Sequence, residues 1–574
     1  MVDRLLASPR YGERMAVDWL DAARYADTNG FQVDRDREIW AWRDWVIGAF
    51  NRNLPFDQFT IEQLAGDLLP NPTLDQLIAT GFSRNNMMNE EGGIDPEEFL
   101  NEYASDRAET TVAVWLAQTL NCCRCHDHKY DPLTAVFALD TPITVEPGAT
   151  VTISLDFSLP NGNKHTIGHF RLALTDAPTP AATVAGQLAA TNPQAAEQVA
   201  ALQKKIQEME LTIPTTLIMA EMPQPRPTFI LTRGAFNQPG EKVEPATPAV
   251  LPSMAADLPR NRLGLAKWLV SPENPLTARV TVNRLWQQAF GYGLVKTSED
   301  FGSQGQSPSH PELLDWLAMD FAGKGWDVKR LMKMMVTSAT YRQGAAFTPE
   351  LIETDPENRM LARSGRNRLL GEFIRDQALA VSGLLVDKIG GPSVKPYHPP
   401  GIYEQLTEGG TTNTYVPGTG DELFRRSLYT YWKRSVPHPA MLFFGTPFRE
   451  VCTIQRPRSN TPLQALNLMN APTYVEASRF LAVRMMENSA DAPQRLAYGF
   501  RAALARTPRP AEMTILERAH QRALADFRAD PEAAKALLAV GTKPADPKYD
   551  SAELAAFTSV ASTILCMDET ITKP

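Results

Sequence analysis

Three of the five cysteines and two of the eight histidines lie within LNCCRCHDHKYDP, residues 120–132. In this stretch Cys122, Cys125 and His126 form the pattern C-x-x-C-H. That spacing lets two thiols form thioethers with a haem while the adjacent imidazole takes an axial position on the iron. We therefore expect a covalently attached haem c, with Cys122 and Cys125 as attachment points and His126 as an iron ligand.

Other side chains in the same stretch support different chemistry. Asp127, His128 and Asp131 follow the motif, and imidazole and carboxylate groups bind zinc or calcium. A divalent metal held by His126, His128, Asp127 and Asp131 is therefore an alternative, as is a structural role for the cluster. A third reading is hydrolysis by a metal-activated water at His126, His128 and Asp131. The sequence leaves open whether the protein is an enzyme.

Two further groups of residues have a functional and a structural reading. Glu90, Glu91, Asp95, Glu97 and Glu98 could bind a hard cation, but such a run is more often a solvated helix start. Trp19, Trp40, Trp42 and Trp45 lie at near-helical spacing, which favours a place in the core over a sugar-stacking platform. We expect the structural reading in both cases.

Composition excludes several classes of protein. The chain has 574 residues and a formal net charge of -9, which argues against binding to nucleic acid or to anionic lipid. No stretch approaches the roughly 18 to 20 apolar residues of a transmembrane helix. The start of the chain lacks the features of a secretory signal. The cysteines are too few and too clustered for a disulfide framework.

The pattern along the chain predicts a mainly α protein with two helical domains, joined by a small β-rich insert and a proline-rich connector. The first domain spans residues 1–134 and includes a helix that begins at Asp95-Pro96. Residues 135–178 alternate apolar and polar side chains, as in short strands. Residues 179–260 combine a charged helix with an extended connector. Helical spacing dominates residues 261–574, where Ser309 to Glu312 should cap and open one helix.

Two long stretches resemble a known family. RLLASPRYGERMAVDWLDAARYADTNGF, NMMNEEGGIDPEEF and CCRCHDHKYDPLT resemble the cytochrome-type domain of the planctomycete cytochrome C domain proteins. NRLGLAKWLVSPENPLTARVTVNRLWQQAFGYGL and TIQRPRSNTPLQALNLMNAPTYVEA resemble the planctomycete-specific C-terminal domain that accompanies it. Both domains are of unknown function in that family.

The resemblance implies an exported protein of the periplasm or cell envelope. On it, Cys122, Cys125 and His126 correspond to the family's C-x-x-C-H-D-H-K. Together with the motif it predicts a c-type haem protein in electron transfer or redox chemistry, linked to polysaccharide breakdown, with a redox protein or polysaccharide-degrading enzymes as partners. The alternative is an envelope binding or scaffold protein whose Cys, His and Asp cluster holds a divalent metal or is structural.

The chain departs from the family pattern at two places. Family members usually carry a signal peptide and further sequence before R-L-L-A-S-P-R-Y-G-E-R, so we expect Met1 to be an internal methionine of a longer protein. They normally continue past K-Y-D-P with aromatic-rich helical sequence, whereas here the β-rich insert follows Thr134 directly. The insert resembles the end of a β-sandwich, which predicts an internal deletion at 134/135.

Overall fold

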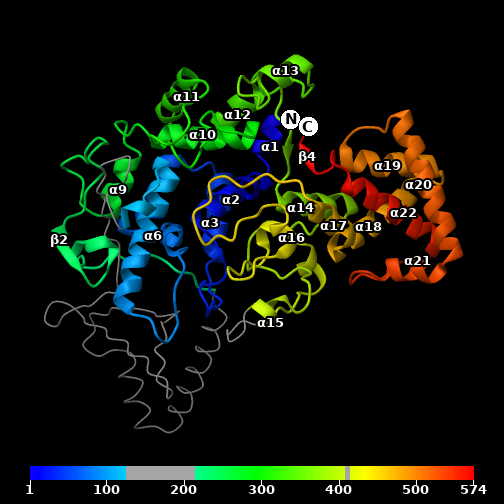
Figure 1. Cartoon of the computed structure of the whole chain (residues 1–574), viewed down its shortest axis with the longest axis horizontal. Helices are drawn as coiled ribbons and strands as arrows, with labels where there is room; N and C mark the ends of the chain where they lie inside the picture. Colours follow the sequence, from blue (N-terminus) through cyan, green and yellow to red (C-terminus); the bar gives the residue numbers. More distant parts are fainter. Residues whose placement is uncertain (125–213, 407–413, 574) are drawn as a thin grey trace, which may run out of the picture.

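The computed structural model describes residues 1–124, 214–406 and 414–573. About 51% of the described residues are helical and 4% are in strands or bridges, which confirms the mainly α prediction. Figure 1 shows the helices of the first half on one side and the helices of the C-terminal part on the other, with the two chain ends next to each other at one edge. Within the described residues, no helix is both long enough and apolar enough to cross a bilayer.

Short helices and one long helix make up the first half. They are α1 (Val2–Leu6), α2 (Arg10–Ala23), α3 (Trp40–Asn51), α4 (Phe56–Ala65), α5 (Leu74–Ala79) and α6 (Pro96–Leu116), with 3-10 turns η1 (Gly66–Leu68), η2 (Thr80–Arg84) and η3 (Asn121–Arg124). The predicted start of α6 is confirmed: the Asp95 carboxylate accepts a hydrogen bond from the Glu97 amide at 2.9 Å, and Pro96 occupies the first turn. Asp95, Glu97 and Glu98 thus belong to the start of a helix, whereas Glu90 and Glu91 lie in the preceding loop, where Glu90 accepts a hydrogen bond from Asn29 at 2.9 Å.

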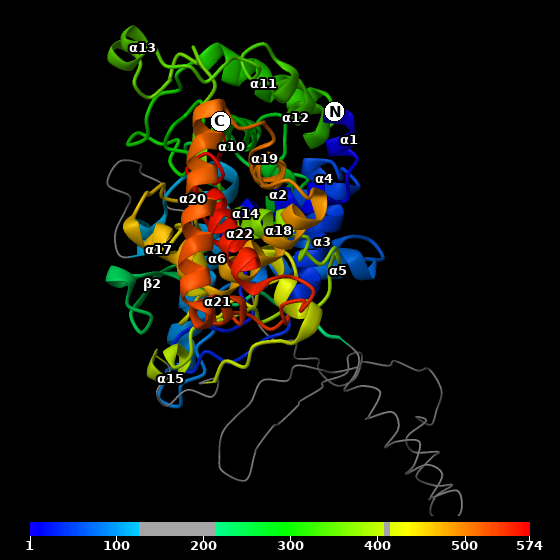
Figure 2. The ribbon, with the colours of Figure 1, turned by 90° about the vertical axis from the view of Figure 1, so that its right-hand side faces the viewer.

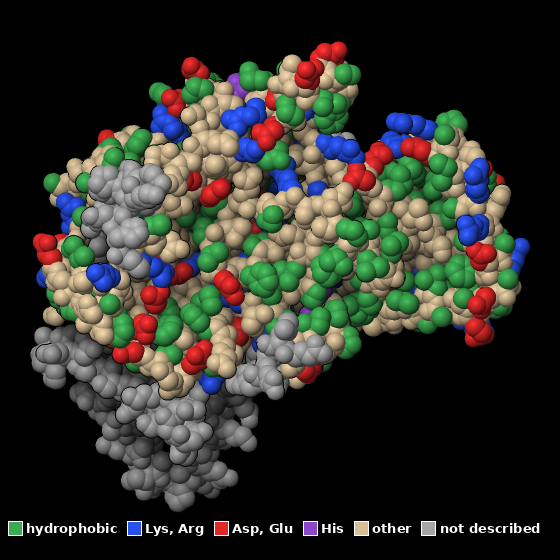
Figure 3. Space-filling view, viewed as in Figure 1, with side chains coloured by type: hydrophobic (Ala, Val, Ile, Leu, Met, Phe, Trp, Pro, Cys, Tyr) green, Lys and Arg blue, Asp and Glu red, His purple; other side chains and the backbone are tan. Residues whose placement is uncertain are grey.

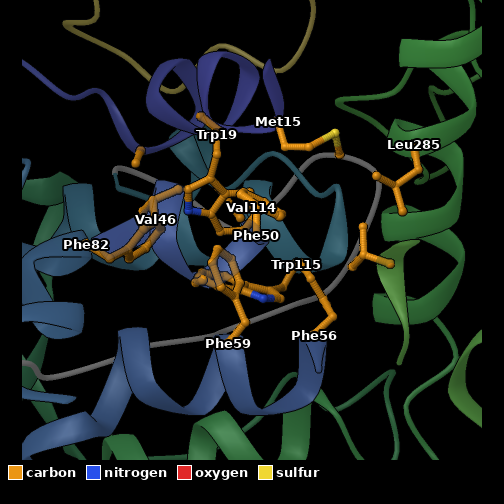
Figure 4. Close-up of a cluster of buried hydrophobic side chains, with 14 of the residues drawn as sticks. Met15, Trp19, Val46, Phe50, Phe56, Phe59, Phe82, Val114, Trp115 and Leu285 are labelled. Atoms are coloured by element: carbon orange, nitrogen blue, oxygen red, sulfur yellow. The ribbon is translucent and has the colours of Figure 1, made fainter. Parts of the chain in front are cut away.

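Aromatic side chains form the core between these helices (Figure 4). Trp19, Trp42 and Trp45 are buried, as their spacing predicts, whereas Trp40 is only half-buried. Trp115 of α6 is fully buried, and its indole N–H donates to the Thr60 hydroxyl at 2.9 Å. Because every buried polar group needs a partner, this bond fixes the register of α6 against α4.

The connector holds more structure than the sequence predicts. Strands β1 (Thr228–Leu231) and β2 (Pro239–Val243) form an antiparallel hairpin, with η4 (Thr232–Gly234) directly after β1. The sequence predicts an extended connector here but does not predict that two of its segments pair as strands. A proline at the first position of β2 is compatible with pairing because a strand end can spare one amide donor. The predicted insert at 135–178 and the charged helix lie outside the described residues.

The next helices pack onto the first half. They are α9 (Arg262–Leu269), α10 (Thr277–Phe290), α11 (Pro311–Gly323), α12 (Val328–Thr337) and α13 (Pro349–Thr354). Arg262 donates to both Asp67 carboxylate oxygens, and the Phe56 amide donates to the Trp326 carbonyl at 3.0 Å. One hydrophobic core therefore includes side chains from residues 15–120 and 254–335. Proline opens α11 as predicted, but the residue before it is His310, which makes no side-chain cap.

A second core fills the C-terminal bundle, which faces the viewer in Figure 2. Its helices are α14 (Gly371–Ser382), α17 (Pro462–Asn470), α18 (Pro472–Asn488), α19 (Ala492–Leu504), α20 (Pro510–Ala529), α21 (Pro531–Leu538) and α22 (Ser551–Cys566). Shorter elements are α15 (Ile402–Leu406), α16 (Pro439–Leu442), η5 (Gly420–Phe424) and η6 (Ser427–Tyr429). Strand β3 (Asn367–Arg368) pairs with β4 (Thr572–Lys573), which brings the end of the chain beside α10 and α12.

Candidate functional site

The cysteine-bearing turn folds back along α6. The helix ends at Leu116, and Ala117 adopts a left-handed conformation (φ 48°, ψ 50°) that reverses the chain. Arg124 then donates to Glu109 at 2.5 Å and to Glu102, both on α6. Because these carboxylates are seven residues apart, they lie two turns from each other on one face. The turn η3 is thus held against the acidic face of α6.

Of the six residues predicted for the site, the structure describes Cys122 alone. Cys122 is exposed, Cys123 is half-buried against the main core, and neither forms a disulfide. Cys125, His126, Asp127, His128 and Asp131 lie outside the described residues. Cys122 fits a c-type haem in one respect, because it supplies a free, accessible thiol for thioether formation. Within the described residues, no group of three or more His, Cys, Asp or Glu side chains could hold a metal ion.

A buried arginine binds the same face of α6. Arg24 follows α2 in a left-handed conformation (φ 63°) and forms an ion pair with Asp106, which lies between Glu102 and Glu109 along the helix. The backbone carbonyl of Arg24 accepts a hydrogen bond from Arg434, a fully buried residue of the second half. The cysteine-bearing turn and the junction between the halves therefore meet at one helix face.

Two carboxylates and two arginines form a buried network at the junction. Asp21 of α2 accepts from Arg449 at 2.9 Å and from Arg456 at 2.5 Å, and Arg456 also binds both oxygens of Glu372 on α14 at 2.7 and 2.8 Å. Burial alone would raise the pKa of Glu372, but the positive charge of Arg456 outweighs it and leaves this pKa below its ordinary value. The network joins helices of the two halves.

Beside this network lies a cavity of about 980 Å³. One wall comes from α1 and α2, and the others come from the end of α10, from α12, from β3, from residues 453–459 and from Lys573. The surface is hollowed near the two chain ends, between the α13 region and the C-terminal bundle, and Lys and Arg side chains are visible in this hollow (Figure 3). A concave site of this size between two packed units is where small ligands commonly bind.

Two buried polar atoms of the cavity wall have no hydrogen-bond partner among the described residues. They are the Tyr11 hydroxyl on α2 and the side-chain oxygen of Gln288 on α10. Burial raises the pKa of Tyr11, so this hydroxyl stays protonated and can donate a hydrogen bond at any physiological pH. Both atoms have almost no accessible surface, so they lie beneath the cavity wall and do not face a ligand directly.

A second cavity of about 290 Å³ adjoins the first. Asn367 of β3 lines both, and the Arg458 guanidinium of the larger cavity lies 4.4 Å from the ring centroid of Tyr292, which lines the smaller one. Sequence analysis identified neither cavity, because its residues are scattered from Met1 to Lys573. The segment QRPRSN, residues 455–460, is the one local signal: it places an arginine on each side of Pro457, and residues 455–459 line the larger cavity.

Two family comparisons cover most of the chain. Residues 1–136 match the family described as PSCyt2, protein of unknown function (DUF1549), and residues 261–520 match the family described as PSD1, protein of unknown function (DUF1553). No curated protein and no solved structure is significantly similar to this chain. Both names belong to planctomycete cytochrome C domain families, in the order that the sequence resemblance indicated. The chain thus combines a PSCyt2-like region with a PSD1-like region, each from a family of unknown function.

Proposed function

We propose that this chain is a binding protein whose ligand occupies the cavity of about 980 Å³ between its two halves. The observation that carries the proposal is the cavity itself, whose wall is built from both halves and includes charged side chains such as Arg342 and Lys573. A concave site with a few polar groups among apolar side chains is typical of small-ligand binding. This reading favours the envelope binding protein over the haem protein.

A cavity-blocking variant tests the proposal. Thr337 ends α12, is exposed and lines the cavity, so Thr337→Trp places a large ring in the opening. Thr514 of α20 is the matched control, because it is also exposed and its hydroxyl also donates to the carbonyl four residues earlier. Thr514→Trp should leave binding unchanged.

The assay is a thermal-shift panel of sugars, organic acids and sugar sulfates on the full chain. A ligand that binds only the folded state raises the melting temperature. We expect at least one compound to stabilise the wild type and the Thr514→Trp control, and to lose its effect in Thr337→Trp. A panel in which nothing stabilises the wild type, or in which Thr337→Trp responds equally, would refute the binding function.

A second function is supported by the exposed, free thiol of Cys122 within the C-x-x-C-H spacing. In this proposal Cys122 and Cys125 attach haem c, His126 binds its iron, and the protein works in the periplasm or cell envelope in electron transfer to a redox partner or to polysaccharide-degrading enzymes. The haem would supply the redox chemistry, and the protein would supply its attachment and the axial imidazole. Zinc or calcium at His126, His128, Asp127 and Asp131 is the competing occupant.

The protein is expressed with an added signal peptide in a host that matures c-type cytochromes, and the group that it binds is then identified. A haem stain that survives a denaturing gel and vanishes in the Cys122→Ala, Cys125→Ala double variant would support covalent haem. Zinc or calcium found by elemental analysis, without haem, would support the metal site and overturn the redox proposal.

A further inference from the structure

The walls of the two adjoining cavities are strongly basic, although the chain as a whole is acidic. The larger cavity is lined by six cations and two carboxylates, namely Arg14, Arg342, Arg368, Arg456, Arg458 and Lys573 against Asp18 and Asp21. The smaller is lined by four cations and one carboxylate, namely Lys296, Arg359, Arg363 and Arg366 against Glu357. Since the chain holds 57 Lys and Arg against 66 Asp and Glu, this excess is local.

Half of these cations are neutralised by carboxylates of the protein. Arg14 pairs with Asp18, Lys296 pairs with Glu357, and Arg456 binds both Asp21 and Glu372. Arg366 and Arg368 share Asp568. These five side chains are part of the folded network and need no ligand.

In the larger cavity, the other three cations have neutral partners or none. Lys573 donates to the Ala289 carbonyl at 3.0 Å and to the Tyr341 hydroxyl at 2.9 Å. Arg458 donates to the Gly291 carbonyl and to the Asn367 side-chain oxygen. The Arg342 guanidinium has no hydrogen bond or ion pair within the described part of the chain. Among the described residues, these three positive charges therefore have no counterion.

The smaller cavity repeats this arrangement. Arg359 donates to the Gln306 side-chain oxygen at 2.8 Å. Arg363 is only 5% exposed, donates to the Pro356 carbonyl at 2.9 Å, and keeps one terminal nitrogen without a partner. A buried guanidinium without a counterion is costly unless an anion pairs with it. Asn367 lines both cavities, so the two sets of cations adjoin at this residue.

We infer that the ligand is a small polyanion, an organic scaffold bearing several sulfate, phosphate or carboxylate groups. One anionic group of this ligand pairs with Arg342 and Lys573 in the larger cavity. Another extends past Arg458 and pairs with Arg359 and Arg363 in the smaller cavity. Guanidinium groups suit this task because their planar donors bind oxyanions through two bonds. The inference rests on the proposed binding function and names the chemical class of its ligand.

Sucrose octasulfate is the probe, and sucrose is its neutral counterpart. Isothermal titration of the full chain at 50 mM NaCl should show saturable binding of the octasulfate, weakened about tenfold or more at 500 mM NaCl because salt screens exposed charge. Arg342→Gln and Arg359→Gln remove one cation from each cavity and should each weaken binding about tenfold. Together they should weaken it by the product of the two effects if both cavities contact one ligand.

Arg522→Gln is the matched control. Arg522 lies on α20 with 85% of its side chain exposed, so its loss should leave affinity and melting temperature unchanged. The two cavity variants should also keep the wild-type melting temperature, because Arg342 has no partner and Arg359 contacts only neutral groups.

Each other outcome has a defined meaning. Sucrose binding as tightly as the octasulfate would refute the anionic class while leaving the binding function intact. Inorganic sulfate binding as tightly would replace the polyanion by a single oxyanion and overturn the inference. No octasulfate binding, with a neutral compound from the panel still lost in Thr337→Trp, would overturn the inference alone. Equal weakening by Arg522→Gln would show nonspecific charge attraction.

Discussion

Replacing Arg456 by methionine should destabilise the protein strongly. Arg456 is 7% exposed, and its guanidinium spans Asp21 and Glu372, each 3% exposed. Asp21 keeps Arg449 as a partner after the substitution, whereas Glu372 loses both hydrogen bonds to its carboxylate. Removing one partner of a buried ion pair costs about 3–5 kcal/mol, because the remaining charge stays desolvated. We expect a loss in this range.

Urea unfolding followed by tryptophan fluorescence measures this loss as a shift in midpoint. Arg279→Met is the control, since Arg279 pairs with Asp315 at the surface with side chains 33% and 53% exposed. Exposed pairs contribute about 0–1 kcal/mol. The double variant Arg456→Met, Glu372→Gln should recover part of the loss, because it also removes the orphaned charge. Arg456→Met costing no more than Arg279→Met would refute the reasoning.

Three further outcomes are expected from the same structure. Burial and the neighbouring His398 lower the pKa of His438 to about 3, so between pH 6.5 and 3 the unfolded chain binds a proton that the folded chain does not. The free energy of unfolding should therefore fall by roughly 2 kcal/mol from pH 7 to pH 5. Urea titrations at the two pH values measure this loss, which should be smaller in His438→Gln. A Cβ atom on Gly12 would meet the Ile47 carbonyl oxygen at 2.2 Å, so Gly12→Ala should lower the free energy of unfolding by about 1–3 kcal/mol. Gly48→Ala on the facing helix α3 should not destabilise the protein. Equal urea midpoints for the two variants would contradict this packing of α2 on α3. Trp115→Phe leaves a void and loses the hydrogen bond to the Thr60 hydroxyl, which still donates to the Phe56 carbonyl at 2.8 Å. Calorimetry should show a loss of about 1–3 kcal/mol, and an unchanged unfolding temperature would contradict this packing.

Local sequence signals account for what could be predicted of the fold. The helical spacing and the Asp95-Pro96 start were correct because capping and amphipathic patterning act within a few residues. The burial of Trp19, Trp42 and Trp45 followed from the same spacing. The β1–β2 hairpin was missed because prolines normally argue against strands, yet here Pro239 sits at a strand end.

The cavities could not be predicted from the sequence in the same way. Their unneutralised cations, such as Arg342, Arg458 and Lys573, are brought together by the pairing of β3 with β4 and by packing of α1 on α12. Such contacts join residues hundreds of positions apart, and no local pattern marks them. The candidate site chosen from the sequence, by contrast, lies mostly outside the described residues, so its haem and metal readings stay predictions.

Hydrogen–deuterium exchange of the full chain, with and without a stabilising ligand from the panel, tests the location of the binding site most directly. We predict slower exchange in residues 336–342 and 453–459, which line the cavity from two sides, and no change in residues 120–124 of the cysteine-bearing turn. Protection confined to the cysteine-bearing turn, with residues 336–342 and 453–459 unchanged, would contradict a binding site between the two halves.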